Sequence, residues 1–374
     1  MKINLAIITT HPIQYQVPLF KALSKVKKFN SKVFYASDQG INKNKLDKDF
    51  NKKFSWNISM LKGYNFIFSK KISNYESFFL RFYNFHEELR NINCNCILIL
   101  GWNKLIYFQA IFYAIKNKIP ILLRCENNLN SDISLTKKLI KIFIFPIFFS
   151  FFDKIFYIGK LNKFFYLYYR VKKSKLIFAP YFVDNNFFNI NKKIKSKIFN
   201  ILFVGKFIDR KRPLDILKIA QLLKNYEYMH FILVGDGPLL LKCKEWAIDN
   251  SLQNVTFKGF QNQLQMRNVY KNANILINSS SYETWGLIVN EAMSAGLPCI
   301  VTERTGCALD LIKRGKTGFI YKLNDLVNLK NCILKIYNSK KNYLRMSLNS
   351  KNIVKKYHLQ KSVKSISDVL ISLK

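Results

Sequence analysis

The sequence predicts an α/β protein built from two doubly wound, Rossmann-like domains that face each other across a cleft. Three observations lead to this prediction. A chain of 374 residues is too long for one ordinary core and fits two domains. Short apolar runs alternate with helical patterns, which is typical of βαβ units in a parallel sheet. The alternation of apolar runs and helical patterns is interrupted once, in the Asn- and Lys-rich stretch 185–197, and then resumes.

In the first half, the expected strands are short apolar runs and the helices are longer apolar patterns. The strands are expected at residues 3–10, 32–35, 96–100, 121–123, 153–158 and 176–178. One helical pattern begins at 19–23, and another runs over 105–115. Strands that are buried on both faces of a parallel sheet read as continuous apolar runs of this kind.

The second half repeats this order. Strands are expected at 201–204, 231–234, 255–257, 275–278 and 298–301, with a helix at 213–223 and a terminal helix after Tyr357. We therefore expect a first domain at 1–184, a linker at 185–197, a second domain at 198–355 and a C-terminal helix at 356–374 that packs back on the first domain. In two such domains, a ligand binds beyond the carboxyl ends of the strands.

The strongly basic charge leaves two explanations open. The chain has 61 Lys and Arg against 22 Asp and Glu, a net charge of +39. Such a charge attracts nucleic acid, an acidic membrane face or a phosphorylated substrate. The abundance of Lys, Asn, Ile, Phe and Tyr is also what the codon usage of an AT-rich genome would produce. A hydrophobic content of 49% excludes a mostly disordered chain.

The cysteines and the N-terminal segment indicate a cytoplasmic protein. The seven cysteines are scattered without a C-x-x-C pair, and the four histidines form no H-x-x-x-H cluster. This argues against a zinc site and a disulfide framework and favours reduced thiols. Residues 3–20 carry no charge, but Pro12, Pro18 and several polar residues make a signal core or a membrane span a poor interpretation.

The most specific stretch, residues 278–298, runs from a strand end through a Ser-rich loop into a helix that begins near Gly286. Backbone N–H groups at a helix start have no partner within the helix; here they belong to Trp285, Gly286 and Leu287. Together with the helix dipole they make an anion site that suits a diphosphate. Further along the same helix, the carboxylate of Glu291 can accept two hydroxyl hydrogen bonds from a ribose.

Glu283 and Glu291 form an E-x7-E pair, and the second Glu begins the pattern E-A-M-x-x-G-x-P. This arrangement resembles family 4 of the retaining glycosyltransferases, which have the GT-B fold. Further landmarks follow in the order of the family: V-G-K-F-I-D-R-K at 204–211, V-G-D-G-P at 234–238, V-T-F-K-G-F at 255–260 and K-T-G-F-I at 316–320. The resemblance is strong over roughly residues 200 to 322 and much weaker in the first half.

The resemblance implies a donor site in the second domain. Lys206 and Lys211 would neutralise the donor diphosphate, and Glu291 would hold the ribose. Glu283 would contact the transferred sugar. Other donor contacts are expected from the neighbouring landmarks, at Gly205, Gly235 and Lys258. The negative charge that grows on a leaving nucleoside diphosphate needs fixed cations and dipoles. Two lysines and a helix start would supply them, so we expect a UDP- or GDP-sugar donor, no cofactor and no metal.

The first half departs from the commoner family pattern. The loop 11–16 stands where many members have a Gly-rich loop, and its T-H-P-I-Q-Y opening resembles bacterial members that build cell-surface polysaccharides. At the end of the strand near 123, Arg124 and Glu126 would face the acceptor or the transferred sugar. A structural ion pair between them is an equally good interpretation. His11 would line the same pocket or cap the first helical region.

The segment 143–152 is rich in Phe and is flanked by Lys137, Lys138, Lys141 and Lys154. It could lie on an anionic membrane surface, which would place the protein on the inner face of the cytoplasmic membrane. A core helix of the first domain is the favoured interpretation, because the run is apolar all round and a sheet must be covered. Both interpretations hold if only its exposed edge touches lipid.

These features predict an enzyme that moves a sugar, with retention at the anomeric carbon, from a nucleotide-diphosphate-sugar to a glycan or lipid-linked acceptor. The pathway would be cell-surface polysaccharide biosynthesis: lipopolysaccharide, O-antigen or capsule. One alternative is a GT-B sugar-nucleotide epimerase, but those enzymes lack this E-x7-E helix. An alternative from another class is a basic nucleic-acid-binding protein. No RNP, KH or helix-turn-helix signature supports it, so no nucleic-acid partner is expected.

Overall fold

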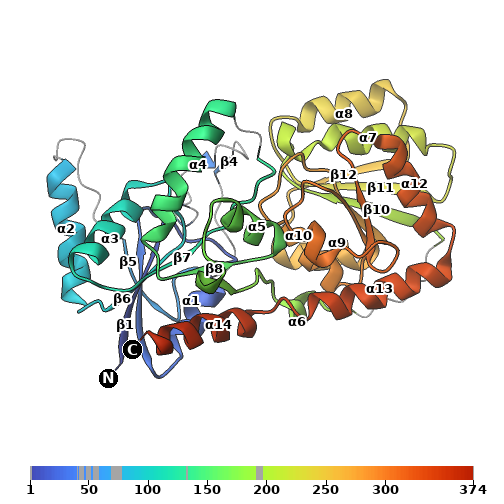
Figure 1. The fold of residues 1–374 in the computed structure, drawn as a ribbon. Helices are drawn as coiled ribbons and strands as arrows, with labels where there is room; N and C mark the ends of the chain where they lie inside the picture. The colour runs from blue at the N-terminus through green and yellow to red at the C-terminus, as the bar shows by residue number, and fades with distance from the viewer. Residues whose placement is uncertain are drawn as a thin grey trace. The chain divides into compact units, whose positions relative to one another are not determined.

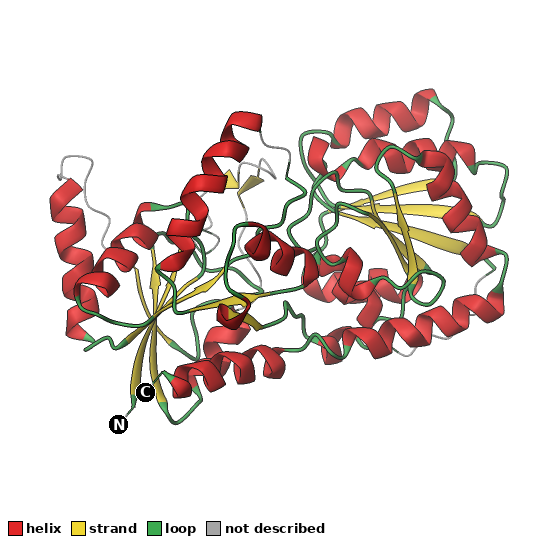
Figure 2. Cartoon of the chain, in the orientation of Figure 1, coloured by secondary structure: helices red, strands yellow, loops and turns green. Residues whose placement is uncertain are grey.

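The computed structural model describes residues 2–39, 41, 46–47, 52–53, 59–68, 78–131, 134–190 and 197–373. The chain divides into two compact units. The first consists of Met1–Lys45, Lys53–Pro180 and Leu359–Lys374, and the second of Leu46–Lys52 and Tyr181–His358. Each unit has its own parallel sheet with helices packed along the strands (Figures 1 and 2).

The first unit contains a seven-stranded parallel sheet in the order β5-β2-β1-β6-β7-β8-β9. Its strands are β1 (Ile3–Thr9), β2 (Phe29–Tyr35), β5 (Asn65–Phe68), β6 (Cys96–Ile99), β7 (Ile121–Arg124), β8 (Lys154–Tyr157) and β9 (Leu176–Phe178). The short strands β3 (Leu46–Asp47) and β4 (Lys52–Lys53) form a separate pair, and all of it except Lys53 is assigned to the second unit. The chain order reverses beside β1, which lies between β2 and β6.

The helices of the first unit cover this sheet with apolar faces. They are α1 (Val17–Ser24), α2 (Phe78–Asn91), α3 (Leu105–Lys116), α4 (Leu135–Ser150), α5 (Lys160–Tyr168), the short η1 (Lys173–Lys175) and α14 (Leu359–Ser372). The C-terminal helix α14 packs on α1 and β9, and the Ser362 hydroxyl donates a hydrogen bond to the Pro180 carbonyl at 2.5 Å. The last helix of the chain therefore belongs to the same unit as the first strand (Figure 1).

The second unit contains a six-stranded parallel sheet in the order β12-β11-β10-β13-β14-β15. Its strands are β10 (Phe199–Val204), β11 (Met229–Val234), β12 (Val255–Gly259), β13 (Ile275–Asn278), β14 (Cys299–Thr302) and β15 (Gly318–Tyr321). Its helices are α6 (Asn185–Phe188), η2 (Asp209–Lys211), α7 (Pro213–Leu222), α8 (Leu240–Asp249), α9 (Gln263–Asn272), α10 (Leu287–Ser294), α11 (Ala308–Leu311), α12 (Leu326–Tyr337) and α13 (Lys340–Val354).

The chain order of the second sheet reverses between β10 and β13. From β10 the chain builds outward through β11 and β12, and from β13 it builds the other way through β14 and β15. Ligands of open α/β sheets bind beyond the carboxyl ends of the strands at such a reversal. We therefore expect a ligand site at the loops that follow β10 and β13.

The stretch that we expected to be a linker, 185–197, is partly folded. Asp184 Oδ1 accepts hydrogen bonds from the backbone N–H groups of Asn186 and Phe187, at 3.1 and 3.0 Å, and so caps α6. Phe188 is buried against the Tyr270 ring within the second unit. The division between the units lies earlier, after Pro180. Within the expected linker, residues 191–196 lie outside the described residues.

The two parallel-sheet units confirm the predicted α/β class, and every strand that we predicted is present. The strand predictions missed β5, β15 and the two-residue strands β3 and β4, and among the helices α2, α5, α8, α9, α12 and α13 were not recognised. Strands of the same length, such as β6 and β7, were recognised, so length alone does not explain these omissions.

Candidate functional site

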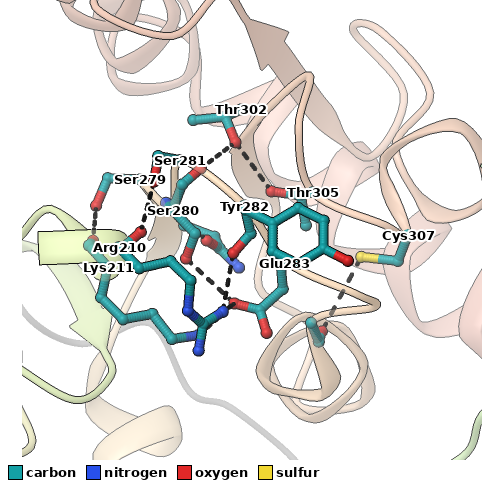
Figure 3. Close-up of polar contacts among 12 residues, drawn as sticks. Arg210, Lys211, Ser279, Ser280, Ser281, Tyr282, Glu283, Thr302, Thr305 and Cys307 are labelled. Carbon is teal, nitrogen blue, oxygen red and sulfur yellow. Dashed lines mark hydrogen bonds and ion pairs between the residues drawn. The ribbon is translucent and has the colours of Figure 1, made fainter. Parts of the chain in front are cut away.

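Two loops at the reversal of the second sheet are joined by hydrogen bonds: the β10 loop (205–212) and the β13 loop (279–286). The Ser279 hydroxyl donates to the carbonyl of Lys211 at 2.8 Å, and the Ser281 N–H donates to the carbonyl of Arg210 at 2.8 Å. In return, Arg210 Nη1 donates to the Tyr282 carbonyl at 2.9 Å (Figure 3). These bonds hold the landmark around Lys211 against the Ser-rich landmark, although the two are about seventy residues apart in sequence.

Glu283 lies where these loops meet, and one of its carboxylate oxygens collects three contacts. Its Oε2 atom forms an ion pair with Lys211 Nζ, accepts a hydrogen bond from the Ser280 hydroxyl at 3.2 Å, and lies 3.6 Å from Arg210 Nη1 (Figure 3). The side chains of Glu283 and Lys211 are only 13% and 14% exposed. The carboxylate is thus held in place before any ligand binds.

Two opposing effects act on the pKa of Glu283. Burial of the carboxylate is the larger single effect and on its own would raise the pKa. The charge and hydrogen bond of Lys211, the charge of Arg210 and the hydrogen bond of Ser280 together outweigh it, and the pKa lies below its ordinary value of 4.5. Glu283 is therefore ionised at neutral pH and can act as a fixed negative charge rather than as a proton donor.

The segment after β14 holds the β13 loop from its other side. The Glu283 N–H donates to the Arg304 carbonyl at 3.3 Å, and the Gly306 N–H donates back to the Glu283 carbonyl at 3.0 Å. A Cβ atom on Gly306 would lie 1.9 Å from the Thr284 carbonyl oxygen, so only glycine permits this close approach. Backbone contacts on both sides therefore fix Glu283, as a preorganised site requires.

Helix α10 begins at Leu287, with Gly286 as its N-cap in the left-handed conformation at φ +101°. The backbone N–H groups predicted to bind an anion lie at this helix start. The side chain of Trp285 points into the core: it is buried, its Nε1 donates to Asn290 Oδ1 at 2.8 Å, and its ring lies 5.7 Å from the Tyr357 ring. Any ligand contact of Trp285 is therefore restricted to its backbone.

Glu291 lies on α10 and is buried. Its Oε2 atom accepts a hydrogen bond of 2.7 Å from the hydroxyl of Tyr270, which is fully buried on α9. This bond fixes one oxygen of the carboxylate and connects α9 to α10. The predicted contact of Glu291 with a ribose stays a prediction.

Gly205 and Gly235 lie at the carboxyl ends of β10 and β11, and their N–H groups donate within the protein. Gly205 donates to Val234 at 3.0 Å and Gly235 to Gly259 at 2.9 Å. Gly235 has a φ of +138°, and a Cβ atom there would lie 1.8 Å from the carbonyl oxygen of Gly205. These glycines therefore allow the two loops to approach closely, and their predicted contacts with a donor stay predictions.

The two other predicted lysines lie in the β10 loop and on β12. Lys206 is half-buried in the β10 loop, where its carbonyl accepts a hydrogen bond from the Ile208 N–H at 3.0 Å. Lys258 is exposed on β12, the edge strand, and β11 separates it from β10. The ion pair of Lys211 with Glu283 joins a predicted lysine to a predicted catalytic carboxylate, and the donor contacts of Lys206 and Lys258 stay predictions.

The first unit brings its predicted residues to one edge of its sheet. His11 follows β1, while Arg124 ends β7 and Glu126 follows it, with β6 between these two strands. His11 Nδ1 lies 2.9 Å from the Thr10 hydroxyl. Arg124 is buried, and its Nη2 donates to the Pro180 carbonyl at 3.4 Å. The two interpretations of Arg124 and Glu126, a sugar contact or a structural pair, both stay open.

Cys125 lies between Arg124 and Glu126, and its environment disfavours a role as a nucleophile. Burial, followed by the charge of Glu126, raises the pKa of its thiol to about 12. Its Sγ atom donates to Asn127 Oδ1 at 2.8 Å. A thiol of this pKa stays protonated at neutral pH, and the thiolate is the reactive form.

Sequence reasoning missed three residues of the site: Arg210, Ser280 and Tyr270. Arg210 and Ser280 stand inside quoted landmarks, next to residues that were singled out, so their positions carried a signal. No sequence signal pointed to Tyr270, because its contact with Glu291 is made between two helices, and the sequence pattern does not show that these helices pack together.

Metal-binding clusters and membrane-spanning helices are absent from the described residues. In that part of the chain, no three His, Cys, Asp or Glu side chains are grouped so that they could hold a metal ion. Nor does any helix there combine the length and the apolar character needed to cross a membrane.

Comparison with known proteins relates the second unit to glycosyltransferases. Residues 184–353 match the family model described as glycosyl transferases group 1. The UDP-Gal:α-D-GlcNAc-diphosphoundecaprenol α-1,3-galactosyltransferase of Escherichia coli is 29% identical over 186 residues, which are 48% of this chain and 47% of that protein. The chain thus spans about half the length of the curated relatives it matches.

Solved glycosyltransferase structures share the fold of the whole chain. HepE of Anabaena, solved in complex with UDP, superposes with a TM-score of 0.78 at 13% identity and covers 100% of both chains. The apo form of the lipopolysaccharide outer core galactosyltransferase WaaB superposes with a TM-score of 0.74 at 19% identity, again over 100% of both chains. At these identities the likeness concerns the fold, and it confirms the predicted GT-B class.

Proposed function

We propose that this chain is a retaining, family 4 glycosyltransferase that moves a sugar from a nucleotide-diphosphate-sugar to a glycan or lipid-linked acceptor. The observation that carries the proposal is the arrangement around Glu283. An ionised, nearly buried carboxylate is fixed beside Lys211 and next to the start of α10, at the reversal of the sheet. The group 1 match covers these residues.

The chemistry of sugar transfer suits the charges of this arrangement. Positive charge develops on the transferred sugar as the glycosidic bond breaks, and a fixed carboxylate such as Glu283 would stabilise it. Negative charge develops on the leaving diphosphate, and we assign its stabilisation to Lys206, Lys211 and the backbone N–H groups at the start of α10. Glu291 would hold the ribose of the nucleotide.

We further propose that the reaction proceeds with retention and without a metal. The site residues named above include no obvious enzymic nucleophile, which favours a displacement on one face of the sugar, assisted by the leaving phosphate. Lysines and a helix dipole would take the place of a cation at the diphosphate. Activity should therefore persist in EDTA. Loss of activity in EDTA that Mg²⁺ or Mn²⁺ restores would refute the metal-free mechanism.

The acceptor and pathway are inferred from the relatives. One relative is named for a diphosphoundecaprenol-linked acceptor and one structural neighbour for the lipopolysaccharide outer core. These names favour cell-surface polysaccharide biosynthesis for this chain, with a cytoplasmic enzyme at the inner face of the membrane. His11, Arg124 and Glu126 are the residues that we assign to the acceptor or the transferred sugar.

A thermal-shift screen against UDP, GDP, CMP and their sugars tests the proposal. A ligand at a hundred times its dissociation constant stabilises the folded state by about 2.7 kcal/mol, so one nucleotide series should raise the melting temperature clearly. Transfer to an acceptor, with the product's anomeric configuration read by NMR, would then establish retention. Conversion of the donor sugar without any acceptor would instead indicate an epimerase. A gel shift with DNA or RNA and no nucleotide effect would indicate a nucleic-acid-binding protein.

A further inference from the structure

Helix α4 is apolar on two opposite faces. Its inner face belongs to the core of the first unit: Phe145 and Phe149 are buried, and both of their rings contact the Phe165 ring of α5. Its outer face carries large exposed apolar side chains at a spacing of four residues, namely Leu135, Leu139, Phe143, Ile147 and, just after the helix, Phe151. The outer face of a helix in a soluble protein is normally polar. The core interpretation therefore holds for the inner face, and the membrane interpretation stays a prediction for the outer face.

The exposed apolar surface continues onto α3. The Phe108 ring of α3 lies 6.4 Å from the Phe148 ring of α4, so the two helices are neighbours in the first unit (Figure 1). Phe108, Phe112 and Ile115 are exposed at helical spacing on α3. We call the exposed apolar side chains of these two helices the α3–α4 face. Large exposed apolar side chains gathered on two neighbouring helices are typical of an interaction site.

The charged side chains within the two segments that carry the α3–α4 face all have one sign. Segments 104–118 and 134–151 contain six lysines, Lys104, Lys116, Lys118, Lys137, Lys138 and Lys141, and no Asp or Glu. All but Lys141 are exposed. Lys141 Nζ lies 5.5 Å from the centre of the Phe145 ring. An apolar face bordered by lysines complements a surface that is apolar inside and anionic at its rim.

We propose that the α3–α4 face docks on an anionic lipid bilayer. Its apolar side chains would enter the boundary of the hydrocarbon, and its lysines would contact lipid phosphates. The 16 residues of α4 extend only about 24 Å, at ~1.5 Å per residue, which is too short to span a bilayer. A second copy of the chain fits this face less well, because it would oppose six lysines with six more and with no carboxylate from these segments.

Vesicle sedimentation tests this proposal without any donor or acceptor, so its result is independent of the proposed sugar transfer. The chain should bind vesicles of phosphatidylcholine and phosphatidylglycerol in equal amounts, bind phosphatidylcholine alone much more weakly, and be released by high salt. Phe143→Ser/Ile147→Ser removes two side chains that are 73% and 65% exposed and should weaken binding about tenfold or more. The matched control Leu241→Ser/Ile248→Ser, at positions 67% and 76% exposed on α8, should bind like the wild type.

A second pair of variants tests the charge. Lys137→Gln/Lys138→Gln should weaken binding to the anionic vesicles by roughly 30-fold, since each lysine near such a surface contributes about 1 kcal/mol. The control Lys340→Gln/Lys341→Gln on α13 lowers the net charge by the same amount and should have little effect on binding to the anionic vesicles. Thermal unfolding of each variant should match the wild type within a few degrees, because all eight side chains are exposed.

Three results would overturn the proposal. The first is wild-type binding by the Phe143→Ser/Ile147→Ser variant, and the second is an equal loss in the α8 control. The third is self-association of the wild type that this variant abolishes, with no vesicle binding by either protein. In that case a second copy covers the α3–α4 face.

Discussion

Lys211 and Glu283 form an ion pair that joins the loop after β10 to the loop after β13 in the second unit. Each side chain is more than four-fifths buried, and the carboxylate also receives the Ser280 hydroxyl. The pair therefore has two consequences that can be measured separately. It stabilises the junction of the loops, and it keeps a negative charge at the place where we propose that the donor sugar binds.

The first prediction is that the two residues are energetically coupled. Lys211→Met leaves the nearly buried carboxylate of Glu283 without its main partner. Glu283→Gln leaves the nearly buried ammonium of Lys211 without a carboxylate partner. Each substitution should therefore lower the free energy of unfolding. The double variant should lose less than the sum, with a coupling of about 1–3 kcal/mol in urea unfolding. The control combines Glu283→Gln with Lys218→Met, at an exposed position on α7, and should be additive. Additive losses for the Lys211 pair would mean that the contact does not stabilise the fold.

The second prediction concerns pH. The pKa of Glu283 is lowered in the folded state, so its stabilising effect is fully present above about pH 4.5 and is lost as the pH falls through the lower folded pKa. The difference in melting temperature between the wild type and Glu283→Gln should be constant from neutral pH down to about 5.5 and shrink below 4.5. A difference that widens on acidification would contradict the sign of the shift.

The third prediction separates the two glutamates of the E-x7-E pair. Glu283→Gln should lower kcat and leave nucleotide affinity nearly unchanged, since its charge matters as positive charge develops on the sugar. Glu291→Gln should weaken binding of the free nucleotide diphosphate roughly 10- to 150-fold, as expected for losing hydrogen bonds to a charged acceptor. Titration calorimetry and steady-state rates report the two effects.

Tyr270→Phe provides a control for Glu291. It removes the hydroxyl that orients the Glu291 carboxylate but keeps the ring and the charge. Nucleotide affinity should therefore fall by less than in Glu291→Gln. If the nucleotide binds equally well to all of these variants, Glu291 has a structural role on α10 and no ribose contact.

The fourth prediction addresses the diphosphate. Lys206→Ala should lower turnover by roughly 10²-fold, which is the usual effect of removing one group that stabilises developing charge. Lys218→Ala, an exposed lysine of the same unit, should keep full activity. Equal activity of the two variants would remove Lys206 from the donor site.

The sequence alone determined the architecture and the order of the landmarks along the chain. Burial on both faces of a parallel sheet requires continuous apolar runs, so strands such as 96–100 and 231–234 could be recognised without a structure. The spacing of Glu283 and Glu291 is likewise local, because both residues flank the start of one helix.

Tertiary structure decided which side chains meet. The partners of Lys211 and Glu291 come from a different loop and a different helix, at separations of 72 and 21 residues. It also divided the residues of 143–152 between core and surface, because the packing of α4 on α5 buries Phe145 and leaves Phe143 exposed. Periodicity reports that a segment is apolar and how its residues are spaced. It carries no information on which distant element covers a given face, since that depends on how the whole chain packs.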